Sequence, residues 1–231
     1  MRTVGYACSG LLLLAGLGCD AVFGPGGVPP DFIPSGFPIP AQEETIGGYG
    51  RDGGDTFVAR SLNGKDLVVF EAEHALDWED GWFTTDAEPG ASGNAYLQVD
   101  PGTAFAAGRF VDFKVRFSHE GTWYCWVRAL MKSADDNGVY LENEKGELLP
   151  MQLCFATDAW HHTSSLRTQT EHCGIRGLVT YEVTANGPGD DLTRVIRFRS
   201  RDAGFRFDRG MFVDTLFYIP MGLGPPESDR Q

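Results

Sequence analysis

The feature that most limits the fold of this chain is a strict alternation of apolar and polar side chains in RFVDFKVRF, residues 109–117. Every second residue from Val111 to Phe117 is apolar, and charged residues stand between them. Successive side chains of a β-strand point to opposite faces, so this spacing predicts a strand with one face on a core and one in water. The segment LVTYEVTA, residues 178–185, has the same period, whereas helical periodicity is nearly absent after Lys65.

Short β-branched and aromatic runs follow one another along residues 65–220, separated by turn signals such as Asn137-Gly138 and Lys145-Gly146. Many short strands predict two sheets that bury their apolar faces against each other. We therefore expect one all-β domain, an antiparallel β-sandwich of the jelly-roll type, over residues 58–220, followed by a C-terminal tail at 221–231. The further strand candidates are Leu67–Glu73, Ala95–Val99, Thr122–Met131, Gly138–Glu142, Leu148–Phe155, Thr193–Ser200 and Met211–Ile219.

The first twenty residues, MRTVGYACSGLLLLAGLGCD, have the layout of a secretory signal, with Arg2, an apolar run at 11–14 and small residues before Cys19. The apolar run is too short to span a bilayer. A cysteine after small residues resembles a bacterial lipoprotein box, so we expect a signal peptide at residues 1–19 and lipidation of Cys19. The protein is then exported and lipid-anchored in the bacterial cell envelope; without lipidation it is simply secreted.

Residues 20–57 are crowded with glycine and proline and show neither the period of a strand nor that of a helix. We expect a disordered linker here. Such a linker either holds the folded domain away from the membrane or is a leader without that role.

Acidic side chains outnumber basic ones by 32 to 19, which gives a formal charge of -13. Affinity for nucleic acids and anionic membranes comes largely from lysine and arginine, so both are poor partners for this chain. We expect a monomer that touches a membrane only through its lipid anchor.

Three cysteines lie in the region expected to fold, and an exported protein can oxidise them. Cys154 and Cys173 flank an expected loop and are the preferred disulfide pair. Cys125 lies within the apolar run TWYCWVRALM, which favours a buried free thiol.

Two carboxylates, Glu71 and Glu73, end the apolar run DLVVFEAE. In a strand, alternate side chains share a face, so their Cα atoms would lie roughly 6.5 to 7 Å apart. Two anions that close call for a cationic partner, unless both are simply solvated at the end of the strand. Paired carboxylates supply the oxygen ligands that Ca²⁺ prefers.

Six blocks in this order, VVFEAEHA, GASGNAYLQV, GTWYCWVRA, DDNGVYLE, DAWHHTS and GMFVDTLFYI, resemble carbohydrate-binding modules of families 6 and 35 and related galactose-binding-like domains. The resemblance covers residues 66–220 and implies two antiparallel sheets. It also implies noncatalytic polysaccharide binding and a structural calcium ion held by Glu71, Glu73 and Asp214. Asn94 replaces a glycine of the family pattern, and residues 166–177 have no counterpart in it.

Sugar rings bind to exposed aromatic platforms flanked by hydrogen-bonding groups. Trp160, in the polar loop TDAWHHT, matches the family's loop tryptophan and is the leading platform, with burial in the core as the alternative. Trp78 and Trp82 form a second candidate. Asn137 is a candidate ligand contact, although Asn-Gly is also an ordinary hairpin turn.

Arginines are concentrated in TRVIRFRSRDAGFRFDRG, residues 193–210. Arg206 and Arg209, near the last expected strand, could bind a uronic acid or a sulfated glycan through bidentate contacts. Alternatively, the arginines of this region lie on the solvent face of a strand and pair with the surplus acids.

Catalysis is disfavoured. The carboxylates at 135–144 lie in a turn-rich stretch, and the sequence has no H-E-x-x-H motif, zinc-type cysteine pair or nucleophile elbow. We expect a noncatalytic domain that binds polysaccharide or another glycan at the cell surface. The alternative is a structural or protein-interaction sandwich of the cell envelope, because a fold does not fix a ligand.

Overall fold

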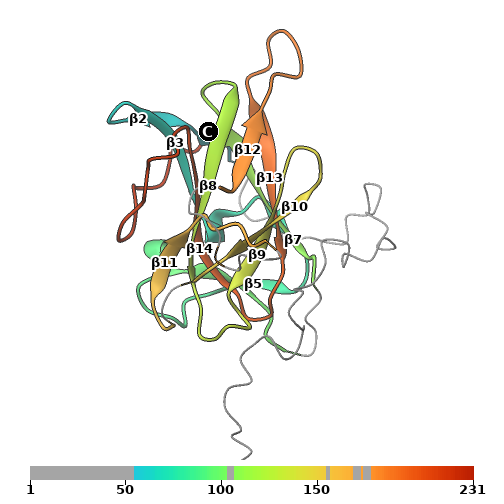
Figure 1. Cartoon of the computed structure of the whole chain (residues 1–231), viewed down its shortest axis with the longest axis vertical. Helices are drawn as coiled ribbons and strands as arrows, with labels where there is room; N and C mark the ends of the chain where they lie inside the picture. Colours follow the sequence, from blue (N-terminus) through green and yellow to red (C-terminus); the bar gives the residue numbers. More distant parts are fainter. Residues whose placement is uncertain (1–54, 103–106, 155–156, 169–172, 174–177) are drawn as a thin grey trace, which may run out of the picture. The chain divides into compact units, whose positions relative to one another are not determined.

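We describe the fold from a computed structural model, which defines residues 55–102, 107–154, 157–168, 173 and 178–231. These residues form β-strands, short 3₁₀ turns and loops, and the all-β prediction is confirmed (Figure 1). Among them, no helix has the length and apolar character needed to cross a bilayer. The predicted signal peptide, the lipidation site Cys19 and nearly all of the linker lie outside the described residues.

The first sheet has the strand order β1-β7-β13-β9-β10, with β4 paired to β7. Most of its pairs are antiparallel, for example Ile196 opposite Phe113, whereas β1 runs parallel to β7. Its strands are β1 (Phe57–Val58), β4 (Asp77–Trp78), β7 (Phe110–Arg116), β9 (Gly138–Glu142), β10 (Leu148–Gln152) and β13 (Thr193–Ser200).

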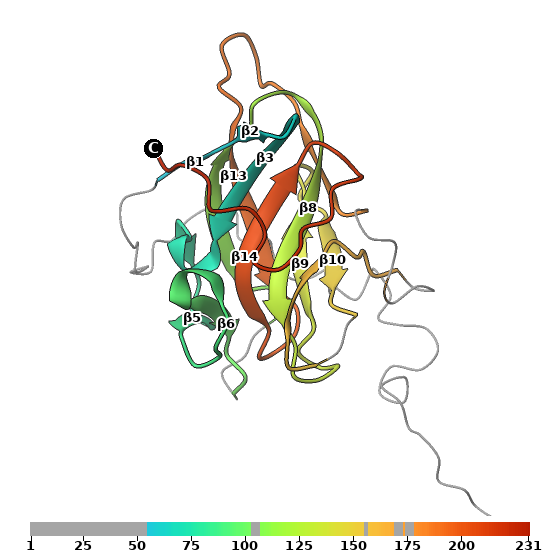
Figure 2. The same ribbon diagram turned by 90° about the vertical axis from the view of Figure 1, so that its left-hand side faces the viewer.

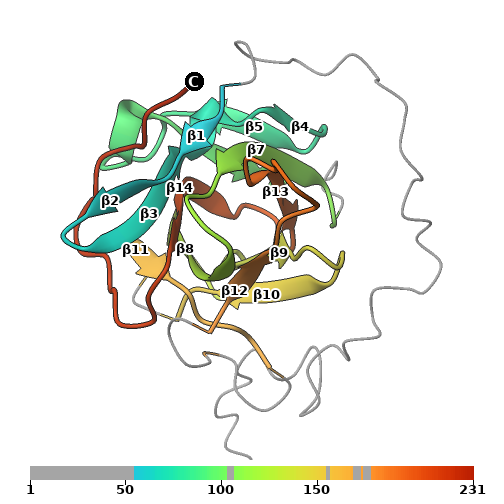
Figure 3. The ribbon, with the colours of Figure 1, turned by 90° about the horizontal axis from the view of Figure 1, so that it is seen from above.

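The second sheet has the order β11-β8-β14-β3-β2, with β12 on β8, β6 on β14 and β5 on β6. The last strand, β14, therefore lies between β3, the first long strand, and β8. Figure 3 shows this sheet facing the first one. Its strands are β2 (Arg60–Leu62), β3 (Lys65–Glu71), β5 (Trp82–Thr85), β6 (Tyr96–Val99), β8 (Gly121–Leu130), β11 (Trp160–Thr163), β12 (Thr180–Val183) and β14 (Arg206–Val213).

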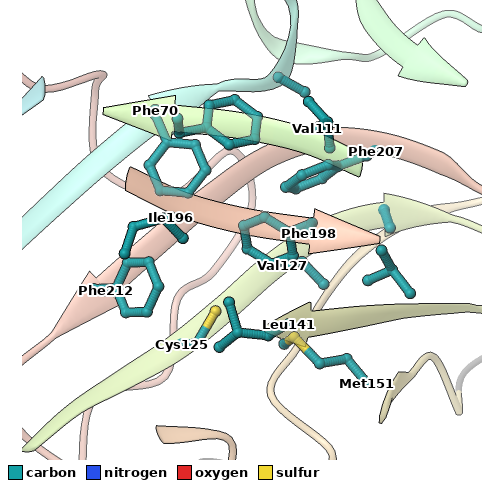
Figure 4. Close-up of a cluster of buried hydrophobic side chains, with 14 of the residues drawn as sticks. Phe70, Val111, Cys125, Val127, Leu141, Met151, Ile196, Phe198, Phe207 and Phe212 are labelled. Carbon is teal, nitrogen blue, oxygen red and sulfur yellow. The ribbon is translucent and has the colours of Figure 1, made fainter. Parts of the chain in front are cut away.

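The main core fills the space between the sheets (Figure 4). The ring of Phe70 of β3 packs against that of Phe113 of β7, with the ring centroids 4.4 Å apart, and Phe198 of β13 packs beside both. The alternation read in β7 is confirmed, with one exception. Asp112, expected in water, is buried and forms a two-bond ion pair with Arg197 of β13.

A smaller cluster lies on the outer face of the second sheet and includes Val69, Trp126 and Met211. The chain after β14 crosses this face, and Tyr218 packs on the cluster (Figure 2). The final residues then pair with the start of the domain through hydrogen bonds between Thr56 and Gln231.

The strands β9 and β13 have the predicted bounds, and most others differ by a few residues. The predicted strand Leu67–Glu73 ends at Glu71, because Ala72–His74 form a 3₁₀ turn. The last strand was predicted at Met211–Ile219 but runs from Arg206 to Val213. The apolar residues after Val213 cross the outer face of the sheet instead of continuing the strand. Hydrophobicity alone does not distinguish a paired strand from a segment that packs across a sheet.

Candidate functional site

The three predicted calcium ligands do not lie together. Arg209 is opposite Glu71 and Val213 is opposite Leu67, so Asp214 lies near the other end of β3, where its N–H donates to the Asp66 carbonyl. Five residues of strand separate Asp66 from Glu71, about 16 Å. Asp214 therefore cannot share an ion with Glu71, and including it in the calcium set was wrong.

The aspartate that lies close to Glu71 is Asp208, and not the predicted Asp214. A register shift between Phe207 and Arg209 marks an irregularity of β14 at this residue. Ser92 joins the two carboxylates: its Oγ lies 2.7 Å from Glu71 Oε2 and 2.9 Å from Asp208 Oδ2, and its N–H donates to Asp208 Oδ1. We call Glu71, Glu73, Ser92 and Asp208 the carboxylate centre. Asp208 was missed although it directly follows the alternating aromatic residues Phe205 and Phe207, which was the available signal.

Two buried arginines neutralise part of this centre. Arg209 forms an ion pair with Glu71, and Arg128 of β8 binds Asp208 at 2.5 Å. Both also donate to main-chain carbonyls, Arg209 to Leu223 and Arg128 to Gly90. Because Arg209 is buried, the prediction that it contacts a glycan is corrected: its side chain binds the protein's own carboxylate and C-terminal tail.

Glu73 has no such partner. Its Oε2 is buried and accepts no hydrogen bond. Burial, with smaller contributions from the negative charges of Glu71, Asp208 and Glu227, raises the pKa of Glu73 to about 8. Glu73 is therefore the carboxylate of this centre that most needs a cation.

A close backbone approach shapes the space beside Glu73. Gly93 has φ of 65°, and a Cβ on it would lie 2.1 Å from Glu73 Oε1, so only glycine fits here without a shift. In the described part of the chain, no three Asp, Glu, His or Cys side chains form a metal-binding group by themselves. An ion at this centre would therefore complete its six to eight oxygens with main-chain carbonyls or water.

Trp160 lies on β11, at an edge of the second sheet, and is half-buried. Its Nε1 donates to the Pro89 carbonyl at 2.9 Å, and Tyr96 packs edge-on at 5.2 Å. Gly90 lies close to the ring, and the Arg128 guanidinium is 5.4 Å from its centroid. The ring is thus held firmly, and Trp160 begins a strand instead of lying in the loop that the sequence predicted.

Charged side chains lie next to Tyr96, because Glu88 and Arg206 both act electrostatically on its hydroxyl. Lys132 Nζ lies 2.9 Å from Glu88 and 3.0 Å from Asp158. Arg206, a predicted glycan contact, binds Asp136 at 2.7 Å and lies 3.8 Å from Glu88. Arg206 is thus near Tyr96, but it is already ion-paired.

Three other predicted contacts are placed inside the domain. Trp82 is buried, with its Nε1 donating to the Arg109 carbonyl, and Trp78 packs against the main core. Asn137 is buried, and its Nδ2 donates to the Leu153 carbonyl. Neither Trp82 nor Asn137 is available to a ligand, because each side chain completes the interior instead.

The arginines of β13 pair with acidic side chains of the protein, which was the alternative to glycan binding. Arg197 pairs with Asp112, and Arg199 with Glu142.

The disulfide prediction is confirmed: Cys154 is bonded to Cys173. Cys125 is a buried free thiol, and burial raises its pKa well above the usual value. The disulfide closes the segment that carries Trp160.

No protein-family model matches the chain. Over 120 residues it is 32% identical to "Uncharacterized protein P23" of Formosa agariphila; the match covers 50% of this chain and 27% of that protein. The chain thus matches only about a quarter of this relative's length.

Carbohydrate-binding modules of families 35 and 6 are among the similar solved structures. A family 35 module from Clostridium thermocellum is 15% identical, with a TM-score of 0.43 over 63% of this chain and 96% of the module. The C-terminal family 6 module of a Zobellia galactanivorans laminarinase is also 15% identical, with a TM-score of 0.41 over 64% and 99%. A family 6 module of Cellvibrio mixtus lichenase 5A, solved with cellotriose, is 11% identical, with a TM-score of 0.41 over 64% and 97%.

Proposed function

We propose that this domain binds polysaccharide noncatalytically at the edge of the sandwich where Trp160 lies. The observation that carries the proposal is the half-buried Trp160, braced edge-on by Tyr96, hydrogen-bonded to the Pro89 carbonyl and lying 5.4 Å from the Arg128 guanidinium. A sugar ring offers apolar C–H faces and a rim of hydroxyls. A fixed indole with nearby donors and acceptors suits both.

We further propose a structural calcium ion at the carboxylate centre, with Glu73 as its principal ligand and Glu71 and Asp208 beside it. The buried, unpartnered Oε2 of Glu73 and the close approach of the Gly93 backbone to Glu73 Oε1 support this site. The ion would neutralise Glu73 and join the end of β3 to β14. Calorimetric titration of Ca²⁺ into the chelated protein tests this, and absence of binding would remove calcium from the proposal without affecting the glycan site.

Export and attachment through a lipidated Cys19 complete the proposed role, a domain that holds glycan at the cell surface. Detergent phase partitioning tests the anchor. The native chain should enter the detergent phase, and Cys19→Ser should shift it to the aqueous phase.

The glycan site is tested by affinity electrophoresis against a panel of neutral, uronic acid and sulfated polysaccharides, with cello-oligosaccharides as soluble competitors. Trp160→Ala should weaken binding at least about tenfold, which corresponds to about 1.4 kcal/mol. Phe217→Ala, at an exposed aromatic in the C-terminal segment, is the matched control and should bind normally. Trp160→Phe keeps an aromatic ring and separates loss of the platform from misfolding. Failure to bind any polysaccharide, or equal binding by Trp160→Ala, would contradict the proposal.

A further inference from the structure

Exposed apolar side chains are concentrated in one short segment after β14. Phe217 is 88% exposed and Met221 is 83% exposed, the highest values among the exposed large hydrophobic residues of the described chain. Contiguous apolar surface of this kind marks an interaction site more often than a chance exposure. We call the exposed apolar residues of this segment the C-terminal apolar strip: Leu216, Phe217, Ile219, Met221 and Leu223.

The segment that carries the strip is apolar on both of its sides. Tyr218 packs inward on the outer cluster of the second sheet, and Pro220 is buried. The strip residues on either side of them face solvent. A segment at the surface of a sandwich normally turns polar side chains outward, whereas apolar side chains on both sides are typical of a layer covered on both faces.

Two turns shape the strip. The Tyr218 N–H donates to the Thr215 carbonyl at 3.5 Å, and the Gly224 N–H donates to the Met221 carbonyl at 2.8 Å. The central positions of the first turn are occupied by a leucine and a phenylalanine, residues 216 and 217. Exposed turns usually carry Gly, Pro, Asn, Asp or Ser at such positions. Burial in a contact gives a reason for this apolar pair that the turn itself does not.

The strip is held in place at both ends. Before it, the Asp214 N–H donates to the Asp66 carbonyl; after it, Arg209 donates to the carbonyls of Leu223 and Pro225. Because the flanking backbone is fixed, the apolar side chains cannot turn inward by a local rearrangement, and a partner would find them preorganised.

Charge favours a second copy of this chain as that partner. Residues 215–226 contain no Asp, Glu, Lys or Arg, although the chain carries a formal charge of -13. In an isologous contact the same patch of each copy faces the other, so charged groups would meet their own kind, and the acidic surfaces of two copies repel each other. An uncharged apolar patch is the surface through which such copies can approach.

The area of the strip determines how strong this contact can be. A large apolar side chain removes roughly 100 to 200 Å² from water when it is fully buried, so the five partly exposed side chains offer on the order of 500 Å² per copy. Two copies would bury about 1,000 Å² together, which is near the lower limit for a specific interface. This area fits a reversible dimer and not an obligate one.

We propose that two copies of this chain associate through their C-terminal apolar strips in an isologous dimer. The contact places Phe217 and Met221 of each copy against the strip of the other and removes them from water. Because the association is reversible, the chain in dilute solution is the monomer expected from its sequence. This proposal is independent of carbohydrate and calcium binding.

Sedimentation velocity of the Cys19→Ser chain, which cannot carry a lipid on that residue, tests the dimer. The sedimentation coefficient should rise from the monomer to the dimer value between about 1 μM and about 1 mM protein. In the same background, Phe217→Ser/Met221→Ser should raise the dissociation constant of the dimer at least about tenfold. Val195→Thr, at an exposed apolar residue of β13 in the first sheet, is the matched control and should dimerise normally. Denaturant unfolding checks that these exposed substitutions leave the fold intact.

A pair of charge variants tests whether the contact is between like patches. Met221→Glu and Met221→Lys each place like charges in both halves of the dimer, and at 0.1 M salt such charges act over about 10 Å. Each variant alone should dimerise at least about tenfold more weakly than the parent chain. An equal mixture of the two should recover most of the lost affinity, because opposite charges then meet across the contact.

Four results would overturn the proposal. They are a monomer at every concentration, a dimer that Phe217→Ser/Met221→Ser leaves unchanged, a mixture of the charge variants that associates no better than either alone, and a monomer whose strip binds phosphatidylcholine vesicles. The last result, measured as cosedimentation with the vesicles that the serine variant loses, would assign the strip to a lipid surface.

Discussion

Glu71 and Arg209 lie directly opposite each other on β3 and β14, and their buried side chains form an ion pair. The same guanidinium donates to the carbonyls of Leu223 and Pro225. One side chain therefore joins the first long strand, the last strand and the C-terminal tail. This pair also explains how a buried carboxylate can exist beside Glu73 and Asp208 without mutual repulsion dominating the site.

Replacing Arg209 should strongly destabilise the domain. Arg209→Met leaves Glu71 buried without its cation, which costs about 3 to 5 kcal/mol in such sites. In the double variant Glu71→Gln/Arg209→Met the uncompensated charge is gone, so at least about half of that loss should be recovered. Denaturant unfolding of the native chain, Arg209→Met, Glu71→Gln and the double variant measures the coupling. Additive losses would show that the ion pair does not hold the two strands together.

Glu73 should make the metal-free protein less stable as the pH rises. Its folded pKa of about 8 lies above its ordinary value of 4.5 because burial disfavours the charged form. The unfolded chain therefore releases this proton first, and stability falls between about pH 4.5 and 8. Glu73→Gln removes this penalty and should stabilise the chelated protein at pH 8 by on the order of 1–2 kcal/mol, after allowance for the partial exposure of the group.

Calcium should reverse that ranking. In saturating Ca²⁺ the native chain should gain stability and Glu73→Gln should not, because the substituted amide supplies one weak ligand instead of a carboxylate. Thermal unfolding of both chains, with chelator and with Ca²⁺, gives the comparison. An equal rise in Tm for the two chains would place the ion elsewhere.

His162 should contribute to acid sensitivity. Burial, with smaller contributions from the positive charges of Arg128 and Arg209 and from His161, lowers its pKa to about 4. The unfolded chain binds this proton near pH 6.5 but the folded chain does not, so stability is complete above pH 6.5 and falls toward pH 4. His162→Phe should remove about 2 to 3 kcal/mol of that fall. Asp202, whose pKa burial raises to about 6, titrates in the same range, so the difference between the two unfolding curves is the quantity to measure.

Gly210 should not tolerate even a methyl group. A Cβ on Gly210 would lie 2.1 Å from Cε2 of Phe70, whose ring is fixed in the core against Phe113. Gly210→Ala should cost about 2 to 4 kcal/mol in denaturant unfolding. Phe70→Leu shortens the opposing side chain, so adding Gly210→Ala to that variant should cost clearly less. The same cost in both backgrounds would mean that the clash is relieved by some other movement.

Much of the fold could be read from the sequence because each strand shows its period locally. The bounds of β9 and β13, the alternation of β7, the buried thiol of Cys125 and the pairing of Cys154 with Cys173 were all predicted correctly. These properties depend on residues close together in the sequence, on turn signals and on the count of cysteines. Trp160 was marked as a sugar platform by its polar neighbours, and that role stays a prediction.

The predictions that failed concern contacts between distant segments. Asp214 was chosen as a ligand, whereas the register of β3 and β14 brings Asp208 to Glu71. Asn137 was a candidate ligand contact, with a hairpin turn as the alternative; its side chain is buried and donates a hydrogen bond to the Leu153 carbonyl.

The sequence by itself determined that this chain forms an all-β domain, since a period of two residues recurs along residues 65–213. Only the tertiary structure decided which carboxylates meet. An alternating pattern is satisfied equally well by registers that differ by two residues, and it does not reveal a local shift such as the one beside Asp208. The packing of Phe70 against Gly210, 140 positions apart in the chain, helps to set that register, and with it the partner of Glu71.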